Sequence, residues 1–573
     1  MKLTKLLRYA CEYKKYLLLC PLVMIGEVAM ETTIPLMVAK LINQETAEMS
    51  QVLKYGGLTV LMALLSLCFG MLGAYFSSKG AMGFSRNLRQ AMFERVQRFS
   101  FKNIDRFSTA SLVTRLTTDV NQVQNTVMML IRMAVRSPIM FVMAMIFAMQ
   151  LQPDLAVVLV VAVPLLAVGI VLIMRAAFPK FQIMMKKYDA LNASVQENLI
   201  GIRVVKAFVR AAHEKEKFSA SADDVTATQR AAEKVVLWNG PMMQIIMNGC
   251  IVAVLWLGGH KIVGGGMLLG DLTAFITYIT QILMSLMMLS FLFISFVLSR
   301  ASVARISEVL EEEPEIASPA QAVTQMPDGS IVFDHVGFSY AGDKDNLVLT
   351  DINLSIRSGE TIGVIGGTGS AKTTLVSLIP RLYDVTSGSI RVGGRDVKEY
   401  DIHALRDQVA MVLQKNVLFS GSIKENLRWG DANATDEEIA AACKAAAADD
   451  FIRSFPDGYD TDLGQGGVNV SGGQKQRLCI ARALLKKPKI MILDDATSAV
   501  DTATDARIRE ALRTFMPETT KIIIAQRIAS VMDADRILVM DQGRVTDFGT
   551  HDELMQRSEI YREVYTSQQK GVA

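Results

Sequence analysis

The sequence has few of the residues that hold metal ions or disulfide frameworks, and little net charge. It contains five histidines, and its six cysteines, at positions 11, 20, 68, 250, 443 and 479, include no CxxC pair. This spacing predicts neither a zinc site nor a disulfide framework. The net charge is only +3, from 60 Lys and Arg against 57 Asp and Glu. Such a balance gives no electrostatic footprint for nucleic acid, so we expect no nucleic-acid partner.

Charged residues are also scarce, at 20% of the chain. Before Arg300 they are spaced so widely that six long apolar stretches lie between them. Five stretches contain no Asp, Glu, Lys or Arg, and the first is interrupted only by Glu27 and Glu31. The six cover residues 16–39, 55–78, 137–153, 155–174, 235–260 and 272–299. A membrane span needs about 20 apolar residues, so we predict six transmembrane helices before Arg300 and none after it. The first is too long for the core of a signal peptide and is expected to be retained.

The basic residues predict how the chain lies in the membrane. Lys and Arg gather before the first span and in the connections 79–136 and 175–234, which the positive-inside rule assigns to the cytoplasm. We therefore expect a multi-pass protein of the inner (plasma) membrane with a cytoplasmic amino terminus. Both basic connections have helix-like periodicity, so the membrane helices should continue beyond the bilayer.

The composition changes near Glu311 to that of an ordinary α/β domain. The run EEEPEIASPAQ is typical of a linker, and strand-like segments then alternate with helical ones. We predict a membrane α-helical bundle over 1–310, a linker over 311–330, and a cytoplasmic α/β P-loop domain over 331–573.

A glycine-rich loop gives the clearest chemical signal. The segment GGTGSAKTT follows the apolar strand TIGVI and opens an apolar helix, so its backbone N–H groups and the helix end are suited to phosphates. Lys372 is expected to reach the β- and γ-phosphates, and the Thr373 hydroxyl to bind Mg²⁺. Ala371 stands where the strict pattern has Gly, and we expect retained binding with some local strain. The loop residues are Gly366, Gly367, Thr368, Gly369, Ser370, Ala371, Lys372, Thr373 and Thr374.

Two further segments complete the expected nucleotide site. The apolar strand IMILDD ends in carboxylates, and Asp494 stands where a Walker B aspartate holds Mg²⁺. Between this strand and the P-loop lies VSGGQ, which presents a hydroxyl and backbone N–H groups ahead of a helix and so forms a second phosphate-binding surface. Its predicted binding residues are Ser471, Gly472, Gly473 and Gln474.

With these motifs in this order, the chain resembles an ATP-binding-cassette (ABC) transporter half of the exporter type, which joins six membrane helices to one nucleotide-binding domain. The resemblance implies ATP and Mg²⁺ as cofactors. It also implies that Tyr340 stacks on adenine, that Gln414 lies near Mg²⁺, and that 498–501 (SAVD) is the D-loop. Such transporters work as pairs, in which each ATP lies between one chain's P-loop and the other chain's SGGQ loop.

The chain departs from the family pattern at two positions beside the γ-phosphate. Asp495 stands where competent members carry the Glu that polarises the attacking water, and its arm is shorter by about 1.5 Å. Gln526 occupies the place of the switch histidine and cannot ionise as His does. VSGGQ remains near consensus. The pattern resembles the degenerate subunit of a bacterial heterodimeric multidrug exporter, whose non-identical partner carries the consensus Glu and His.

Other interpretations stay open. Asp495 and Gln526 are also compatible with a slow homodimeric ATPase in which the two changes are independent. Transport is expected to move drugs or lipids of amphipathic character outward, but a siderophore-type importer or a non-transporting regulatory subunit has the same motifs.

Charged and methionine residues in the membrane half leave the substrate undecided. Glu27 and Glu31 lie four apart, as do Arg132 and Arg136, so they either form an internal clamp or face a cavity and attract cations. Of the 33 methionines, 26 precede Arg300, which suits an adaptable apolar surface but also suits membrane helices in general.

Overall fold

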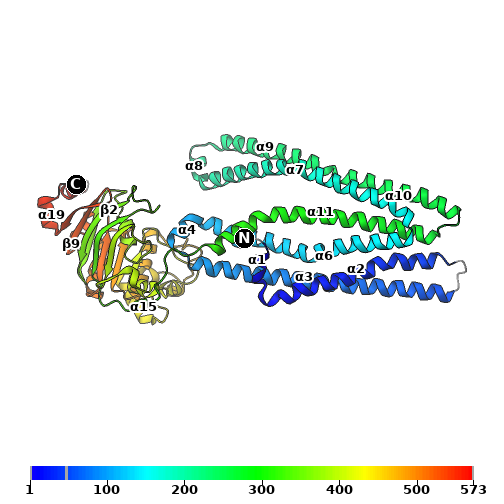
Figure 1. Ribbon diagram of the computed structural model, residues 1–573. Coiled ribbons are helices and arrows are strands. Elements are labelled where there is room, and N and C mark those ends of the chain that lie inside the picture. Colours follow the sequence, from blue (N-terminus) through cyan, green and yellow to red (C-terminus); the bar gives the residue numbers. More distant parts are fainter. Residues whose placement is uncertain (1–2, 45–48, 571–573) are drawn as a thin grey trace. The chain divides into compact units, whose positions relative to one another are not determined.

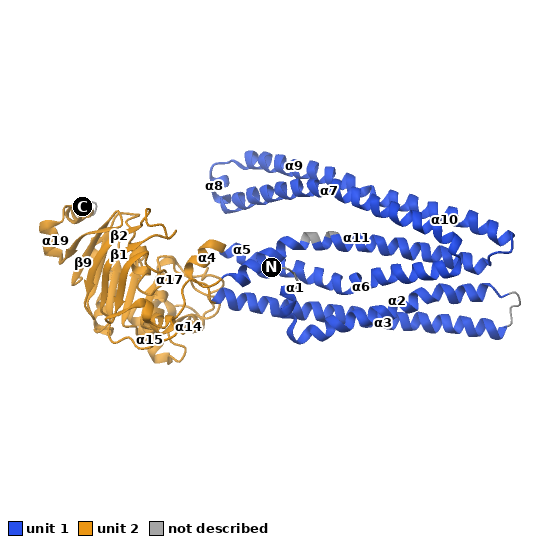
Figure 2. Cartoon of the chain, in the orientation of Figure 1, with its two compact units in different colours: residues 1–97, 109–312 blue, residues 98–108, 313–573 orange. Residues whose placement is uncertain are grey.

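The computed structural model describes residues 3–44 and 49–570. The chain divides into two compact units, one made of residues 1–97 and 109–312 and the other of 98–108 and 313–573 (Figure 2). The second unit therefore includes a short segment from the range predicted as the membrane region. The predicted linker, 311–330, follows the last long helix, and the domain boundaries stay a prediction.

The first unit is entirely helical in its described part. Within the described residues, six helices are long and apolar enough to cross a membrane, as the sequence predicts. Two of them have 49 and 48 residues, or roughly 70 Å at 1.5 Å per residue, so they extend well beyond a hydrocarbon core of about 30 Å. The helices of this unit are α1 (Leu3–Leu6), α2 (Lys14–Ile42), α3 (Met49–Gln97), α5 (Thr109–Thr114), α6 (Val120–Leu151), α7 (Pro153–Ile200), α8 (Ile202–Ala207), α9 (Ala211–Leu237), α10 (Asn239–Val263) and α11 (Leu269–Glu311).

Small residues let helices of this unit pack closely. A Cβ on Gly73 of α3 would lie 2.0 Å from Met24 Cε of α2, and one on Gly83 would lie 2.2 Å from the Tyr13 ring. Helix pairs in membranes commonly use such glycines, because lipid provides no hydrophobic drive between them. Elsewhere α7 packs along both α9 and α10 (Figure 1).

Polar contacts fix α11 against its neighbours. Tyr278 is fully buried and its hydroxyl donates to the Thr32 carbonyl of α2 at 2.9 Å. Asp119 ends the π-helical turn Arg115–Asp119 before α6 and is 1% exposed. Its carboxylate accepts hydrogen bonds from Ser302 (2.8 Å) and Arg305 (2.7 Å) of α11. These bonds tie the turn that precedes α6 to α11.

The second unit contains two sheets. One has the strand order β2-β1-β4-β5, and the other has the order β10-β9-β3-β8-β7-β6. In the larger sheet β3, β6, β7, β8 and β9 run parallel, so their carboxyl ends meet at one edge. The strands are β1 (Ile331–Phe338), β2 (Leu349–Ile356), β3 (Thr361–Gly366), β4 (Ser387–Val392), β5 (Arg395–Asp396), β6 (Val409–Val412), β7 (Ile490–Asp494), β8 (Thr520–Ile524), β9 (Arg536–Asp541) and β10 (Arg544–Gly549).

Helices complete the second unit and enclose two apolar cores, one on each side of β3 and β7. The continuous burial of β7 and β8 is typical of parallel strands covered on both faces. The helices are α4 (Phe101–Phe107), α12 (Lys372–Ser377), α13 (Ile402–Gln408), α14 (Ile423–Leu427), α15 (Asp436–Ala445), α16 (Asp449–Arg453), α17 (Gly472–Leu485), α18 (Thr502–Phe515), α19 (His551–Arg557) and α20 (Glu559–Lys570). The predicted combination of a membrane helical bundle with an α/β domain is confirmed.

Candidate nucleotide site

The P-loop joins β3 to α12, as the sequence predicts. Lys372 is the first residue of α12, and its ammonium donates to the carbonyl oxygens of Gly366 and Gly367, both at 2.8 Å. A weaker contact of 3.3 Å reaches Ser370 Oγ. Burial lowers the Lys372 pKa, while Asp494 and Asp495 oppose that shift. One lysine charge therefore faces the interior of the loop with two carboxylates nearby.

The backbone of this loop requires residues that tolerate left-handed conformations. Gly369 has φ = +86°, which is easy for glycine. Ala371 has φ = +69°, and a residue with a Cβ costs roughly 1–2 kcal/mol there. The local strain expected from replacing the pattern's Gly is thus present. A Cβ on Gly367 or Gly369 would meet nothing within 4 Å, so this side of the loop is open to a ligand.

Two carboxylates follow the buried strand β7. Asp494 is 2% exposed, and burial raises its pKa, an effect that the nearby Thr373 hydroxyl partly offsets. Within the described residues its Oδ2 atom is buried and has no hydrogen-bond partner. A hydroxyl beside an unpartnered carboxylate oxygen is the kind of oxygen set that Mg²⁺ binds together with nucleotide phosphates. The residues therefore fit the predicted metal, with Thr373 and Asp494 as direct candidates.

Asp495 and Gln526 contact each other. The Gln526 amide donates to Asp495 Oδ2 at 2.9 Å, and the Gln414 side chain lies near the same carboxylate. Burial raises the Asp495 pKa, and these two amides partly offset the rise. Asp495 also has φ = +50°, and its N–H donates to the Ile524 carbonyl at the end of β8. Both departures from the family pattern thus form one hydrogen-bonded pair.

An aromatic cluster adjoins the P-loop helix. The Tyr340 hydroxyl lies 3.0 Å from Thr374 Oγ1, and its ring meets Phe338 and Tyr383 edge to face, with centroids 4.9 and 5.2 Å apart. Tyr340 is 43% exposed. An exposed aromatic face next to a phosphate-binding loop is suited to a nucleobase, and the stacking of Tyr340 on adenine stays a prediction.

The same cluster extends to α4. Tyr383 donates to Asp105 Oδ2 at 2.8 Å and meets the Phe101 ring at 6.0 Å. Burial and the Asp105 contact both raise the Tyr383 pKa, so the phenol stays a donor. Helix α4 (Phe101–Phe107) is one of three short helices in the two basic connections, together with α5 (Thr109–Thr114) and α8 (Ile202–Ala207). No motif in the sequence singles out Tyr383.

The SGGQ loop caps α17. Ser471 Oγ accepts from the Gln474 N–H at 3.3 Å, while Gln474 Oε1 accepts from the Ser471 N–H at 2.8 Å. A Cβ on Gly473 would lie 2.7 Å from the Ala499 carbonyl of the D-loop, which explains the glycine. Within the part of the chain that the structure describes, no hydrogen bond or ion pair links this loop to the P-loop.

Sequence reasoning missed one residue between these parts. Gln476 of α17 is 4% exposed and donates to Ser498 Oγ at 3.1 Å, while its Oε1 accepts from the Ala499 N–H at 3.0 Å. Its amide also lies 3.4 Å from the Asp495 carbonyl. Gln476 therefore links the SGGQ helix to the D-loop and to the end of β7. A Gln among the apolar positions of the helix KQRLCIARALL was the available signal.

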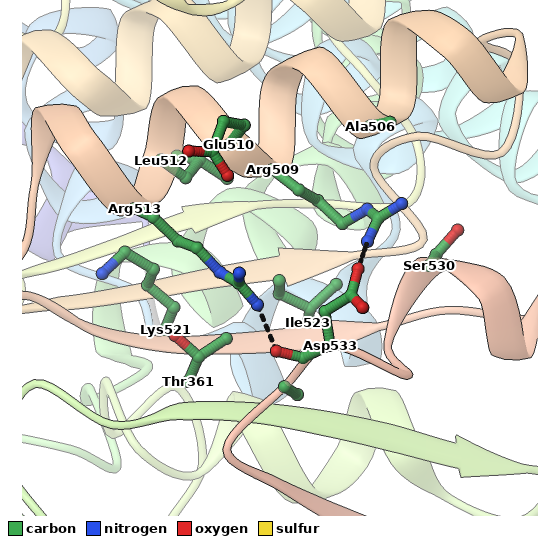
Figure 3. A pocket seen from close by; sticks show the side chains of 11 residues that line it. Thr361, Ala506, Arg509, Glu510, Leu512, Arg513, Lys521, Ile523, Ser530 and Asp533 are labelled. Carbon is green, nitrogen blue, oxygen red and sulfur yellow. Dashed lines mark hydrogen bonds and ion pairs between the residues drawn. The ribbon is translucent and has the colours of Figure 1, made fainter. Parts of the chain in front are cut away.

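A separate pocket of about 220 Å³ lies between α18 and the sheet (Figure 3). Arg509 bonds Asp533 Oδ2 at 2.7 Å, and Arg513 bonds the Asp533 carbonyl. Lys521 donates to the Thr519 carbonyl, and burial lowers its pKa. The cations of this pocket are thus engaged by the chain itself, and the residues lining it in the described structure include none of the predicted site residues.

Comparisons with known proteins agree with this geometry. Residues 17–311 match the ABC transporter transmembrane region, and residues 349–498 match the ABC transporter family. YfiB of Bacillus subtilis, an uncharacterized ABC transporter ATP-binding protein, is 37% identical over 96% of this chain and 95% of its own length. An ATP-dependent lipid A-core flippase of Desulfotalea psychrophila is 34% identical over 84% of each chain.

A solved structure extends the similarity to the whole fold. A bacterial Atm1-family ABC exporter with ATP bound matches 97% of this chain and 99% of its own, with a TM-score of 0.85 and 25% identity. The matched regions cover both the helical bundle and the nucleotide site. The chain therefore belongs to the ABC transporter family, as an exporter-type half-transporter that joins a six-helix membrane region to one ATP-binding domain.

Proposed function

We propose that this chain is the ATP-binding, weakly hydrolysing half of a heterodimeric exporter for amphipathic compounds. The observation that carries the proposal is the 2.9 Å hydrogen bond between Gln526 and Asp495. A base that activates water must reach it, and a displacement of about 1 Å costs roughly 100-fold in rate. Here Asp495 has a shorter side chain than Glu, and Gln526, which donates the hydrogen bond to it, cannot become charged.

ATP and Mg²⁺ are proposed to bind at the P-loop with the roles predicted above. When bound, Mg²⁺ neutralises charge on the phosphates. Thr373 and Asp494 would hold the metal, with Gln414 nearby, and Lys372 would hold the phosphates. Tyr340 orients the adenine base.

The contact between Asp495 and Gln526 also argues against two independent substitutions, because a change in one residue alters the surroundings of the other.

The partner is proposed to be a second, non-identical half-transporter with Glu and His at the corresponding positions. The Ser471–Gln474 loop begins helix α17, and a helix N-terminus is suited to phosphate, yet this loop makes no bond to the chain's own P-loop in the described structure. The turn around α8 is also strongly apolar and exposed, with Phe208 at 74% and Val209 at 85%. Both features are suited to contacts with another subunit in the cytoplasm.

The test is to purify the tagged chain from its native membranes and identify the half-transporter that accompanies it. ATPase activity is then compared for the pair with Asp495→Asn here and with Glu→Gln at the corresponding position of the partner. We expect the partner change to abolish hydrolysis and Asp495→Asn to alter it less than about twofold, since the partner holds the working base. A brisk ATPase of the chain alone that is lost in Asp495→Asn would contradict the proposal.

A further inference from the structure

A pocket of about 210 Å³ lies within the membrane unit, between α2, α6 and α11. Glu31 and Arg136 line it together with residues of α11 that include Thr280 and Gln281. Met140, Met284 and Met288 supply apolar walls. The volume is below the roughly 300–1,000 Å³ of drug-sized sites, so it suits one polar group with the first part of an apolar body.

The positive charge that lines this pocket, on Arg136, is already paired with carboxylates. Arg136 bonds Glu31 Oε2 at 2.6 Å and also lies 3.5 Å from Glu27 Oε1. One guanidinium is thus shared by two carboxylates, and little of its charge is available to an anion. Arg132, which we considered as a second clamp residue, makes no ion pair within the described residues and does not line the pocket.

The polar groups that the pocket offers to a ligand are mainly hydrogen-bond acceptors. Gln281 Oε1 is buried and has no partner in the described structure. The hydroxyls of Thr277 and Thr280 donate back to the Thr273 and Ile276 carbonyls at 3.1 Å, so only their lone pairs face a ligand. Ser285 does the same at 2.7 Å. An unpaired buried acceptor destabilises the structure, and a ligand N–H would supply the missing partner.

We infer that this pocket binds the protonated amine of an amphipathic organic cation, whose N–H groups donate to Gln281 and Glu31 while its apolar body packs on the methionines. The inference rests on the proposed export function and names its substrate class. Methionine thioethers are polarisable and adapt to varied apolar shapes. An anionic amphiphile such as a phospholipid is disfavoured, because the only cation lining the pocket in the described structure already serves two carboxylates.

The probe for this site is dansylcadaverine, a fluorescent primary amine, titrated without ATP into the full chain in lipid nanodiscs. Three related probes serve as controls. The N-trimethyl derivative keeps the positive charge but has no N–H donor on that nitrogen, and the N-acetyl derivative removes the positive charge. A carboxylate analogue carries a negative charge in its place. We expect the amine to bind at least about tenfold more tightly than the other three, as for hydrogen bonds to a charged group. Equal binding of the trimethyl probe, tighter binding of the carboxylate, or no saturable binding of the amine would overturn the inference.

Variants locate the effect. Gln281→Leu and Thr280→Val remove acceptors without breaking an ion pair, and each should weaken the amine at least about threefold with little effect on the N-acetyl probe. Thr273→Val is the matched control for Thr280→Val, because Thr273 makes the same bond to its own helix (3.0 Å to Leu269) and does not line the pocket. Unchanged amine affinity in Gln281→Leu would also count against the site.

ATP-analogue binding in the same samples separates this inference from the proposed function. Loss of amine selectivity with intact ATP binding defeats the inference alone. A partner that lacks the consensus Glu defeats the heterodimer and leaves the amine site standing.

Discussion

Lengthening Asp495 to Glu tests the explanation of weak hydrolysis at this chain's own site. The substitution moves the carboxylate forward by about 1.5 Å. Because a misplacement of about 1 Å costs roughly 100-fold in rate, Asp495→Glu should raise hydrolysis at this site about 100-fold, equivalent to about 2.7 kcal/mol of barrier. Adding Gln526→His should raise it further, since the present amide holds Asp495 at 2.9 Å without carrying charge.

The assay is photolabelling of the purified pair with 8-azido-ATP that carries ³²P at either the α- or the γ-position. After separation of the two chains, the ratio of γ- to α-label on this chain reports hydrolysis at its own P-loop. We expect both labels to persist in the natural sequence and the γ-label alone to be lost in Asp495→Glu.

Asp541→Glu is the matched control, because Asp541 ends β9 and is exposed. The reasoning is refuted if Asp495→Glu and the double variant both keep their γ-label as well as their α-label. In that case the length of the carboxylate side chain does not limit hydrolysis. If the natural sequence loses γ-label as fast as the variant, the site is not weak at all.

Three further predictions concern single contacts. Lys372→Ala should weaken ATP-analogue binding at least about tenfold in a fluorescence titration, because charge-assisted bonds to phosphate are lost. Tyr383→Phe removes the hydrogen bond to Asp105 of α4 but keeps the ring against Tyr340. Stimulation of the ATPase by substrate should therefore fall, while nucleotide affinity changes less than about twofold. An unchanged stimulation ratio would show that the bond between Tyr383 and Asp105 does not transmit the effect of substrate. Tyr278→Phe should lower the free energy of unfolding by about 1 kcal/mol in an SDS titration, since a buried bond to the α2 backbone is lost; an unaltered midpoint would show that water or lipid replaces it.

The fold was predictable where the signal is local. Runs of apolar residues mark the membrane helices, and the P-loop's glycines, lysine and flanking strand lie within one short segment. The strain at Ala371 also followed from a single position, because only glycine adopts φ = +69° at no cost.

The short helix α4 shows where local signals fail. Its N-terminus is set by a capping box between Ser100 and Asn103, but Asn replaces the usual Glu or Gln at the third position. Its place is fixed instead by distant groups, among them the Glu313 carbonyl, which accepts from Asn103 at 3.2 Å, and Tyr383. Seven residues carry too little periodicity to locate such a helix from the sequence.

The contact between Asp495 and Gln526 depends on strand register, which no single segment contains. Strands β7 and β8 are parallel neighbours, and Asp494 pairs with Ile524. Asp495 therefore follows its strand by one residue and Gln526 follows the adjacent strand by two, so the two side chains leave the same edge of the sheet together. From the sequence they were two separate departures. In the folded chain each is the other's hydrogen-bond partner, so Gln526→His alone would disturb the short carboxylate it now holds, and a full gain in hydrolysis should require both changes.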